Sequence, residues 1–346
     1  RVHIVDLREE LKEGNKSIFS RKLQACMEDR LEKGEQMMLF LNRRGYSGFI
    51  SCRTCGEVIK CPHCDVSLSE HRNGILYCHY CGFSKPVVKN CPVCKSPQIA
   101  GFRAGTEQIE EAVHKMFPFA TILRMDADTT RNKDDYDEIL SRFSNREADI
   151  LIGTQMIVKG HDFPGVTLMG ILAADLSLNS NDYRAGERTF QLLVQAAGRA
   201  GRGETPGEVV FQTYQPDHYA ITLSATQDYP AFYEAEMCFR ELMDYPPAAG
   251  LLAIQLTGPD QKRLVRLSEA VVKWVKAVPL EVPVGIIGPA QASLSKKNDI
   301  YRYVVYLKHK DRESLIQIQS AVEEQVNKSE LKRESVFFDY NPLHMF

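Results

Sequence analysis

The stretch CRTCGEVIKCPHCDVSLSEHRNGILYCHYCGFSKPVVKNCPVC, residues 52–94, contains eight of the ten cysteines of this 346-residue chain. Thiolates in C-x-x-C turns are the common ligands of tetrahedral structural zinc, and eight of them are the set for two Zn(Cys)₄ sites. Because every pair is complete, no position is left open for a catalytic water. The sequence therefore predicts two structural Zn²⁺ ions. The C-x-x-C pairs are Cys52/Cys55, Cys61/Cys64, Cys78/Cys81 and Cys91/Cys94.

The spacing of the pairs leaves their pairing open. The linkers between successive pairs are five, thirteen and nine residues long. A nested arrangement suits these lengths best, because the thirteen-residue linker can form a hairpin around Asn73-Gly74. One ion would then bind the inner four cysteines and the other ion the outer four, although sequential and interleaved pairings also fit the spacing. Cys26 and Cys238 stand alone and are predicted to be small core residues.

The composition is that of an ordinary globular protein, with 44% hydrophobic and 25% charged residues, and the length suits two or three domains. No apolar run approaches the ~18 residues of a membrane span. Clustered cysteines without a signal peptide indicate metal binding in a reducing cytoplasm. The net charge of −2 disfavours a nucleic-acid coat protein but not a local binding groove. We expect a monomer, and the start at Arg1 suggests a piece of a longer protein.

Strand and helix patterns alternate on both sides of the cysteine region. Such alternation predicts a mostly parallel, doubly wound sheet with the cysteine region inserted after its second strand. The predicted strands are 2–7, 37–41, 98–102, 120–125, 149–153, 166–173 and 207–214, and the predicted helices are 20–32, 105–116, 134–143 and 184–200.

The pattern changes after residue 215. Helices rich in aromatic residues lead to Tyr245-Pro246-Pro247, and the elements that follow have the order β-α-β-β-α-β, which is typical of a ferredoxin-like domain. Their predicted ranges are 251–257, 261–278, 284–287, 301–308, 312–327 and 335–340. The predicted domains are an α/β lobe (1–50 and 98–214), a cysteine-rich insertion (51–97), a helical connector (215–246) and a C-terminal α+β domain (247–346).

Two motifs in the second part of the lobe suit phosphate chemistry. QAAGRAGR, residues 195–202, places Arg199 and Arg202 three apart, near one face of the predicted helix. Guanidinium groups pair with phosphate oxygens and stabilise the charge that develops in phosphoryl transfer. GTQMIVKGHDF, residues 153–163, follows a buried strand. Thr154 at a helix start suits a phosphate, and Lys159-Gly160 suits a backbone or nucleotide contact.

These segments resemble the second RecA-like lobe of superfamily 2 helicases. GTQMIVKGHDFPGV resembles motif V, QAAGRAGR resembles motif VI, and MMLFLNRRGYSGF, residues 37–49, resembles the motif IV strand. Eight cysteines directly after NRRGY, together with RAGERTFQLLVQAAGRAGR and YPPAAG, resemble the PriA (primosomal protein N′) family of bacterial replication-restart DNA helicases. The resemblance covers essentially the whole chain and implies a RecA-like second lobe with a two-zinc insertion and a C-terminal domain.

The resemblance also implies function. It implies a 3′-to-5′ ATP-dependent helicase that recognises forks, D-loops and single strands and starts primosome assembly. Arg202 would be the arginine finger and Arg199 a second γ-phosphate or interlobe contact. The family uses the nested zinc pairing. The C-terminal domain would bind DNA, the single-strand-binding protein and other primosome proteins, with Arg312 as a candidate contact. The nucleotide and DNA cleft would be lined by Gly153, Thr154, Lys159, Gly160, Asp162 and Gln195.

One departure bears on activity. The chain contains no G-x-x-x-x-G-K-[ST] and no acidic box before these motifs, so Mg-ATP would bind to a first lobe outside this chain. We therefore expect no ATP hydrolysis by this chain alone. A zinc-ribbon DNA-binding or scaffold protein on an inactive lobe is the alternative, against which the intact arginine pair argues. Motifs V and VI do not by themselves distinguish a DNA helicase from an RNA helicase.

Overall fold

The computed structural model describes residues 1–41, 50–64, 66–71, 74–79, 81–100, 105–126, 129–130, 132–157, 163–180, 182–201, 203, 205–329 and 331–343. By its internal contacts the chain forms two compact units. The first comprises Arg1–Val58, Val88–Ser180 and Arg184–Tyr233, and the second comprises Ile59–Val87, a short piece ending at Tyr183, and Glu234–Phe346. The boundary thus runs through the cysteine-rich region.

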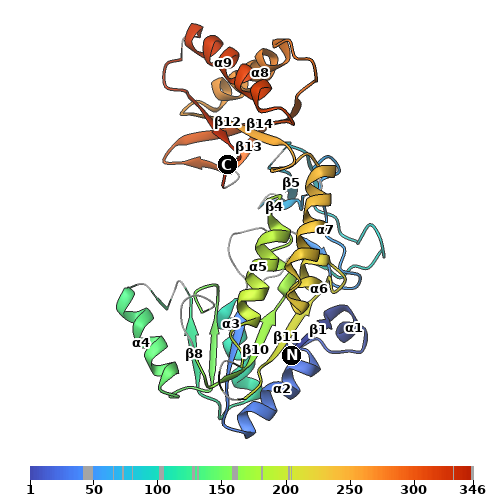
Figure 1. Ribbon diagram of the computed structural model, residues 1–346, viewed down its shortest axis with the longest axis vertical. Coiled ribbons are helices and arrows are strands. Elements are labelled where there is room, and N and C mark those ends of the chain that lie inside the picture. The colour runs from blue at the N-terminus through green and yellow to red at the C-terminus, as the bar shows by residue number, and fades with distance from the viewer. Residues whose placement is uncertain are drawn as a thin grey trace. The chain divides into compact units, whose positions relative to one another are not determined.

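A parallel sheet of six strands forms the centre of the first unit (Figure 1). Its order is β1-β11-β10-β2-β9-β8, and every adjacent pair is parallel. The inner strands are apolar on both faces, as strands covered by helices on both sides must be. This confirms the predicted α/β lobe. The strands are β1 (Val2–Asp6), β2 (Gln36–Leu41), β8 (Ile122–Met125), β9 (Ile150–Gly153), β10 (Val166–Leu172) and β11 (Glu208–Thr213).

Helices pack on both faces of this sheet. Helices α2 (Arg21–Glu32) and α3 (Thr106–Met116) bury side chains such as Leu23 in the core on one face. Helices α4 (Lys133–Ser144) and α5 (Ala185–Ala197) bury theirs on the other face. The Ser20 hydroxyl accepts the Leu23 N–H at 3.2 Å and begins α2 where the sequence predicts it. Figure 1 also shows α1 (Leu7–Lys12) and α6 (Tyr219–Thr226).

The described part of the predicted strand 98–102 does not join the main sheet. Ile99–Ala100 form strand β7, which pairs antiparallel with β3 (Ser51–Cys52) at the base of the cysteine-rich region, and residues 101–102 lie outside the described residues. A short apolar segment has no partner encoded in its own pattern, so its place could not be derived from periodicity. A three-stranded sheet contains β4 (Ser69–His71), β5 (Ile75–Tyr77) and β6 (Ser84–Pro86); in the sequence β4 and β5 lie between the inner cysteine pairs, and β6 follows the second of them.

The second unit contains a four-stranded antiparallel sheet. Its order is β13-β14-β12-β15, the ferredoxin-like order predicted from the β-α-β-β-α-β pattern. Helices α8 and α9 cover one face of it (Figure 1) and bury their apolar side chains there. The elements are β12 (Gly250–Gly258), α8 (Gln261–Ala277), β13 (Gly285–Lys297), β14 (Ile300–His309), α9 (Arg312–Lys328) and β15 (Ser335–Tyr340).

Strand β13 is much longer than the predicted 284–287. It continues past Gly288-Pro289, a dipeptide that reads as a turn, because its register with β14 shifts twice and absorbs the irregularity. Helix α7 (Tyr229–Leu242) leads into this unit and carries Cys238, which is exposed, so the prediction of a core cysteine is wrong there; Cys26 is buried as predicted. None of the described helices is both long and apolar enough to cross a membrane.

Candidate metal sites and motor-lobe motifs

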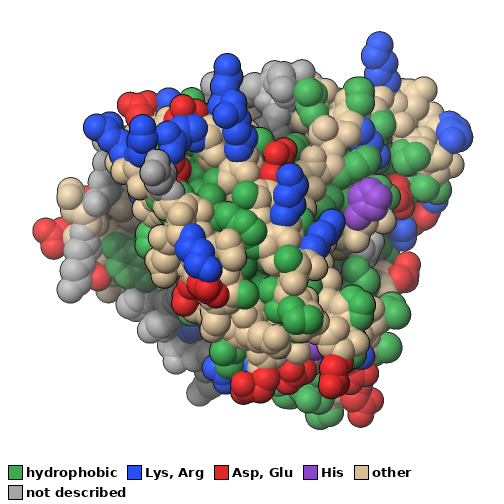
Figure 2. Space-filling view, turned by 90° about the horizontal axis from the view of Figure 1, so that it is seen from above, with side chains coloured by type: hydrophobic (Ala, Val, Ile, Leu, Met, Phe, Trp, Pro, Cys, Tyr) green, Lys and Arg blue, Asp and Glu red, His purple; other side chains and the backbone are tan. Residues whose placement is uncertain are grey.

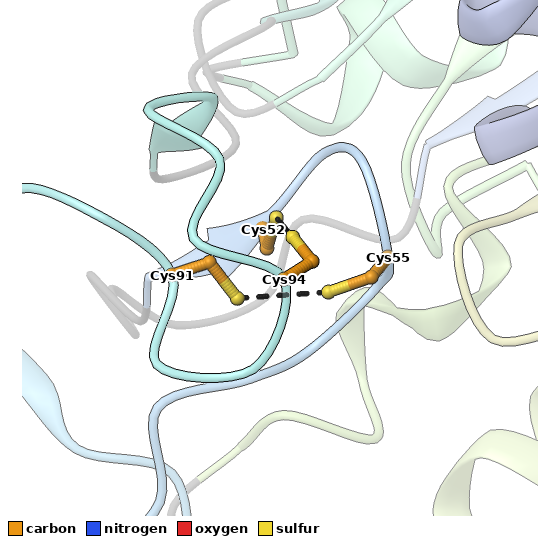
Figure 3. Close-up of side chains that lie close together, drawn as sticks. All are labelled: Cys52, Cys55, Cys91 and Cys94. Carbon is orange, nitrogen blue, oxygen red and sulfur yellow. Dashed lines mark hydrogen bonds between the residues drawn. The ribbon is translucent and has the colours of Figure 1, made fainter.

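The described cysteines form two groups of four, and the grouping is the nested one. Cys52, Cys55, Cys91 and Cys94 form the outer site, and the four inner cysteines form the inner site; in each group the Sγ atoms lie within 4.8 Å of one another. In the outer site the Sγ atoms of Cys52 and Cys94 are 3.5 Å apart and those of Cys55 and Cys91 are 3.6 Å apart. Figure 3 shows these four side chains turned toward one another from two loops. The inner ligands are Cys61, Cys64, Cys78 and Cys81.

Both groups fit zinc. Sulfurs at ~2.3 Å from a tetrahedral zinc ion lie ~3.8 Å from one another, close to the observed separations. A disulfide needs ~2.05 Å, and all ten cysteines are free. Four soft donors around one point, with no acidic or histidine ligand in the set, are the donors of a structural zinc site rather than of a calcium or magnesium site.

The four C-x-x-C turns, which we call knuckles, share one backbone pattern. In each, the first cysteine donates its N–H to the carbonyl five residues later, at 2.7 to 2.9 Å. In three of them the residue after the second cysteine donates back to the first and has a positive φ: Gly56 at 80°, Gly82 at 81° and Lys95 at 61°. The positive φ at this position favours glycine, which explains why two of the pairs have the sequence C-x-x-C-G.

The backbone of the knuckles also acts on the thiols. Burial opposes ionisation of Cys52, but the N–H groups of Cys55 and Thr54 outweigh it and lower the pKa of Cys52 to about 7. Burial and neighbouring thiols raise the pKa of Cys55 to about 12 and that of Cys61 to about 12. Most of these thiols hold their protons unless a cation compensates the crowded negative charge, so metal binding must release protons.

The first knuckle is seated on the carboxyl edge of the parallel sheet. A Cβ on Gly56 would lie 2.3 Å from the Tyr214 carbonyl oxygen, directly after β11. Arg8, directly after β1, donates to the Cys55 carbonyl at 3.4 Å. The Arg53 guanidinium lies 4.8 Å from the centre of the Tyr214 ring. This contact surface could not be predicted from the sequence, because its residues come from three distant segments.

Asp175 is a buried residue that stabilises the backbone against which the first knuckle packs. It is 4% exposed and accepts the Tyr214 N–H at 3.2 Å. Burial raises the pKa of this carboxyl group, and the Tyr214 N–H and Arg53 offset part of that effect. This buried carboxyl group, in the 3-10 helix Ala174–Leu176, fixes the backbone direction after β11, which is the surface that the knuckle contacts.

Gly153 and Thr154 end strand β9. A Cβ on Gly153 would lie 2.4 Å from Ile157 and 2.8 Å from the Met125 carbonyl oxygen, so only glycine fits at this strand end. The Thr154 N–H is 3.4 Å from that same carbonyl, and the Ile157 N–H donates to the Thr154 carbonyl at 3.1 Å. The chain therefore turns tightly at the carboxyl edge. Lys159, Gly160 and Asp162 lie outside the described residues.

The arginine motif lies just beyond α5. The helix ends at Ala197 with Gly198 as its C-cap, so half-buried Arg199 does not lie on the predicted helix face. Gly201, at φ +77°, donates to the Val166 carbonyl at 3.0 Å, and a Cβ on it would lie 2.2 Å from the Gly207 nitrogen. The two glycines thus end the helix earlier than its apolar pattern indicates. Gln195 is exposed on the last turn of α5, and Arg202 lies outside the described residues.

The described motif residues lie at opposite edges of the sheet. Gly153 is level with Phe40, whereas Val166, which holds Gly201, is level with Gln36 at the start of β2. Four residues of strand separate the two levels, or about 13 Å. The structure thus places Gly153 and Thr154 at the carboxyl edge and the Arg199–Gly201 turn at the amino edge.

Arg312, the candidate partner contact, is the first residue of α9. Its guanidinium carbon lies 6.0 Å from the centre of the Tyr340 ring on β15. Figure 2 shows that on one face of the molecule Lys and Arg side chains gather in one corner and otherwise stand singly among hydrophobic and uncharged ones. This mixed surface agrees with the small net charge of −2.

Three family models match this chain in order. The PriA DNA helicase Cys-rich region matches residues 61–86, the helicase conserved C-terminal domain matches residues 94–204, and the primosomal protein N C-terminal domain matches residues 241–343. The first of these contains the inner site alone, while Cys52, Cys55 and Cys91 lie outside all three ranges.

Curated relatives match nearly the whole chain. "Replication restart protein PriA" of Bacillus subtilis (strain 168) is 44% identical over 99% of this chain and 43% of its own length. The proteins of the same name from Synechocystis sp. and Haemophilus influenzae are 44% and 36% identical, over 89% and 86% of this chain. The chain spans less than half of the length of these relatives, 38% and 41% for the latter two.

Proposed function

Because this chain belongs to the PriA family of replication restart proteins, we propose that it forms the second motor lobe, the zinc-binding region and the C-terminal domain of an ATP-dependent 3′-to-5′ DNA helicase. The complete protein would recognise stalled forks and D-loops and initiate primosome assembly. The family match covers 99% of this chain but 43% of the first relative, so the activity belongs to a longer protein.

The observation that supports this proposal is that the two motifs predicted to bind phosphate lie at opposite edges of one sheet. A motor lobe must bind the nucleic-acid backbone while it also contacts a nucleotide held by the other lobe. Gly153 and Thr154, at the tight turn after β9 on the carboxyl edge, would contact the DNA backbone. The Arg199–Gly201 turn at the other edge supports the γ-phosphate contact, with Arg202 as the arginine finger. Lys159, Gly160, Asp162 and Gln195 complete the proposed cleft.

Arginine substitutions in the full-length protein test the motor assignment. Arg202→Ala should lower DNA-stimulated ATP hydrolysis by about 10³-fold or more while DNA binding is retained. Arg199→Ala should also lower hydrolysis. Arg188→Ala, at an exposed position on α5, is the matched control and should leave hydrolysis unchanged. Loss of both hydrolysis and DNA binding in Arg202→Ala would instead indicate a folding role and contradict the assignment.

This chain alone should not hydrolyse ATP, because it contains no Walker lysine to hold Mg-ATP. Purified without fusion partners, it should show no DNA-stimulated release of phosphate. Turnover above the background of an Arg202→Ala sample prepared in parallel would refute this.

We infer two zinc ions per chain, because the eight cysteine thiols form two groups of four. The Zn²⁺ would hold the knuckles together and take no part in hydrolysis. Metal analysis of the purified chain should give about two zinc per chain, and one or none would contradict the eight-thiolate assignment.

The partners that we propose are forked and single-stranded DNA, the single-strand-binding protein and other primosome proteins. Arg312, at the start of α9, is the proposed protein contact on the C-terminal domain. Arg312→Ala in the full-length protein should weaken binding of the single-strand-binding protein and leave fork binding unchanged. An equal loss of both would place Arg312 in the DNA site instead.

A further inference from the structure

The two metal sites belong to different compact units. The outer ligands fall within Arg1–Val58 and Val88–Ser180, in the unit of the parallel sheet. The inner ligands fall within Ile59–Val87, which groups with the C-terminal sheet. A single zinc-folded module would be expected to keep both sites together. The contacts on each side explain why the region divides instead.

The outer site is anchored on the motor lobe through its first knuckle. Gly56 packs against the Tyr214 carbonyl, and Arg8 donates to the Cys55 carbonyl. Arg8 itself is held by Asp6, with Nη2 2.7 Å from Oδ2 and Nε 2.9 Å from Oδ1. A bidentate pair of this kind fixes the direction of the guanidinium group, so the knuckle meets a rigid surface.

The inner site is anchored on strand β13 through its third knuckle. The Tyr77 hydroxyl accepts the backbone N–H of Gln291 at 3.2 Å, and Nδ1 of His79 lies 3.4 Å from the carbonyl oxygen of the same residue. Both backbone groups of Gln291 are thus engaged by two side chains that flank Cys78. Tyr77 is half-buried and His79 is 8% exposed, so neither is free to stack on a ligand.

Strand β13 needs such a partner. It is an edge strand, and its register with β14 shifts both between Ile287 and Ala290 and between Gln291 and Lys296. An irregular edge leaves backbone groups without a regular ladder, and an uncovered edge invites pairing with other chains. Gly82 also approaches this strand, because a Cβ on it would lie 3.3 Å from the Pro289 carbonyl oxygen.

The change from one anchor to the other occurs within two residues. Val58 pairs with Ser51 in the first unit, and Lys60 pairs with Ser67 in the second. Only Ile59 lies between them, and it is 2% exposed. The boundary between the two units therefore falls between two bridges, each of which lies within a single unit.

We propose that the inner metal site is a structural part of the C-terminal domain, in which Tyr77 and His79 are positioning residues that hold the edge strand β13 in place. The outer metal site stabilises the motor lobe instead. Loss of metal from one site would therefore loosen one unit and spare the other. This inference concerns the chain's own folding and does not depend on helicase activity.

Hydrogen exchange measured by mass spectrometry on this chain tests the division. Cys61→Ser/Cys64→Ser should speed exchange in β13 and leave β1 and β11 unchanged. The matched variant Cys52→Ser/Cys55→Ser should speed exchange at the ends of β1 and β11 and leave β13 unchanged. Equal effects of the two variants on both units, or an inner variant that leaves β13 protected, would overturn the proposal.

A milder pair of variants keeps both metal sites intact. Tyr77→Phe removes the acceptor of the Gln291 N–H, so exchange of that amide should become about five-fold faster, as the loss of a hydrogen bond of about 1 kcal/mol predicts. Tyr303→Phe is the control, because the Tyr303 hydroxyl accepts side-chain Nε2 groups, from Gln291 at 3.1 Å and from Gln261 at 3.5 Å, whereas the Gln291 backbone N–H donates to Tyr77. Both variants should retain two zinc. An unchanged Gln291 amide in Tyr77→Phe, or the same acceleration in Tyr303→Phe, would refute the anchor.

Discussion

The knuckle glycines allow the seating of the outer site to be measured against an internal control. Gly56 has φ +80° and its Cβ would lie 2.3 Å from the Tyr214 carbonyl oxygen, whereas Gly34, at the end of α2 in the same unit, has φ +66° with nothing within 4 Å. Gly56→Ala therefore meets both a backbone penalty and a steric clash. Gly34→Ala meets the backbone penalty alone.

The two penalties can be estimated separately. An alanine in the left-handed region costs about 1 kcal/mol or somewhat more. Forcing a methyl group against a backbone carbonyl costs about 2 kcal/mol in addition, as overpacking does elsewhere. Gly34→Ala should therefore destabilise the first unit by about 1 kcal/mol and Gly56→Ala by about 3 kcal/mol. For a unit of this size these values correspond to losses in Tm of about 3 °C and about 9 °C.

Thermal unfolding followed by circular dichroism, at a fixed free zinc concentration, measures both changes. Gly82→Ala, with the same φ and a looser 3.3 Å contact, should fall between them, although it acts on the second unit. Zinc content should stay at about two per chain in all three variants. Equal losses in Gly56→Ala and Gly34→Ala would refute the seating of the knuckle on Tyr214.

Three further changes test the two units. The Glu208 carboxylate lies 2.8 Å from the Lys22 ammonium group. Burial raises the pKa of this carboxyl group, but its basic partners outweigh burial and keep the pKa below its usual value. Glu208→Gln should therefore lower the free energy of unfolding by about 1 kcal/mol at pH 7, and this difference should vanish as the pH falls through the lowered pKa. Burial raises the pKa of Asp175, so its contribution is lost as the pH rises through the raised pKa. Asp175→Asn, which keeps an acceptor for the Tyr214 N–H, should therefore flatten the fall of Tm as the pH rises through that raised pKa, and an unchanged slope would contradict the burial argument. Tyr245 is 1% exposed and stacks on Tyr183. Tyr245→Ala should lower the free energy of unfolding of the second unit, measured in urea, by about 3 to 5 kcal/mol. A loss below about 1 kcal/mol would show that the stack is not part of the core of that unit.

The sheet and the metal groups could be predicted because their signals are local. A run such as 37–41, apolar at every position, indicates a strand buried on both faces, and C-x-x-C indicates a metal turn wherever it occurs. Helix α1 could also have been predicted, because Asp6 followed by Glu9 is a helix-start signature. In the structure the Asp6 side chain accepts the Arg8 N–H.

What could not be predicted depends on distant partners. The segment 98–102 is apolar, but its pairing with Ser51–Cys52 is a tertiary choice. Gly288-Pro289 resembles a turn, yet β13 continues beyond it because register shifts accommodate the pair. The division of the two metal sites between two units depends on Gln291, which is 212 residues from His79. No spacing within the cysteine region records that contact.

That separation of 212 residues has a consequence for synthesis. At about 5 to 20 residues per second, the ribosome delivers Gln291 about 10 to 40 s after His79 has emerged. The outer site is complete much sooner, because Cys94 follows Cys52 by 42 residues, which take about 2 to 8 s to synthesise. We therefore expect the inner cysteines and the small sheet β4-β5-β6 to be complete on the ribosome well before their docking strand is made.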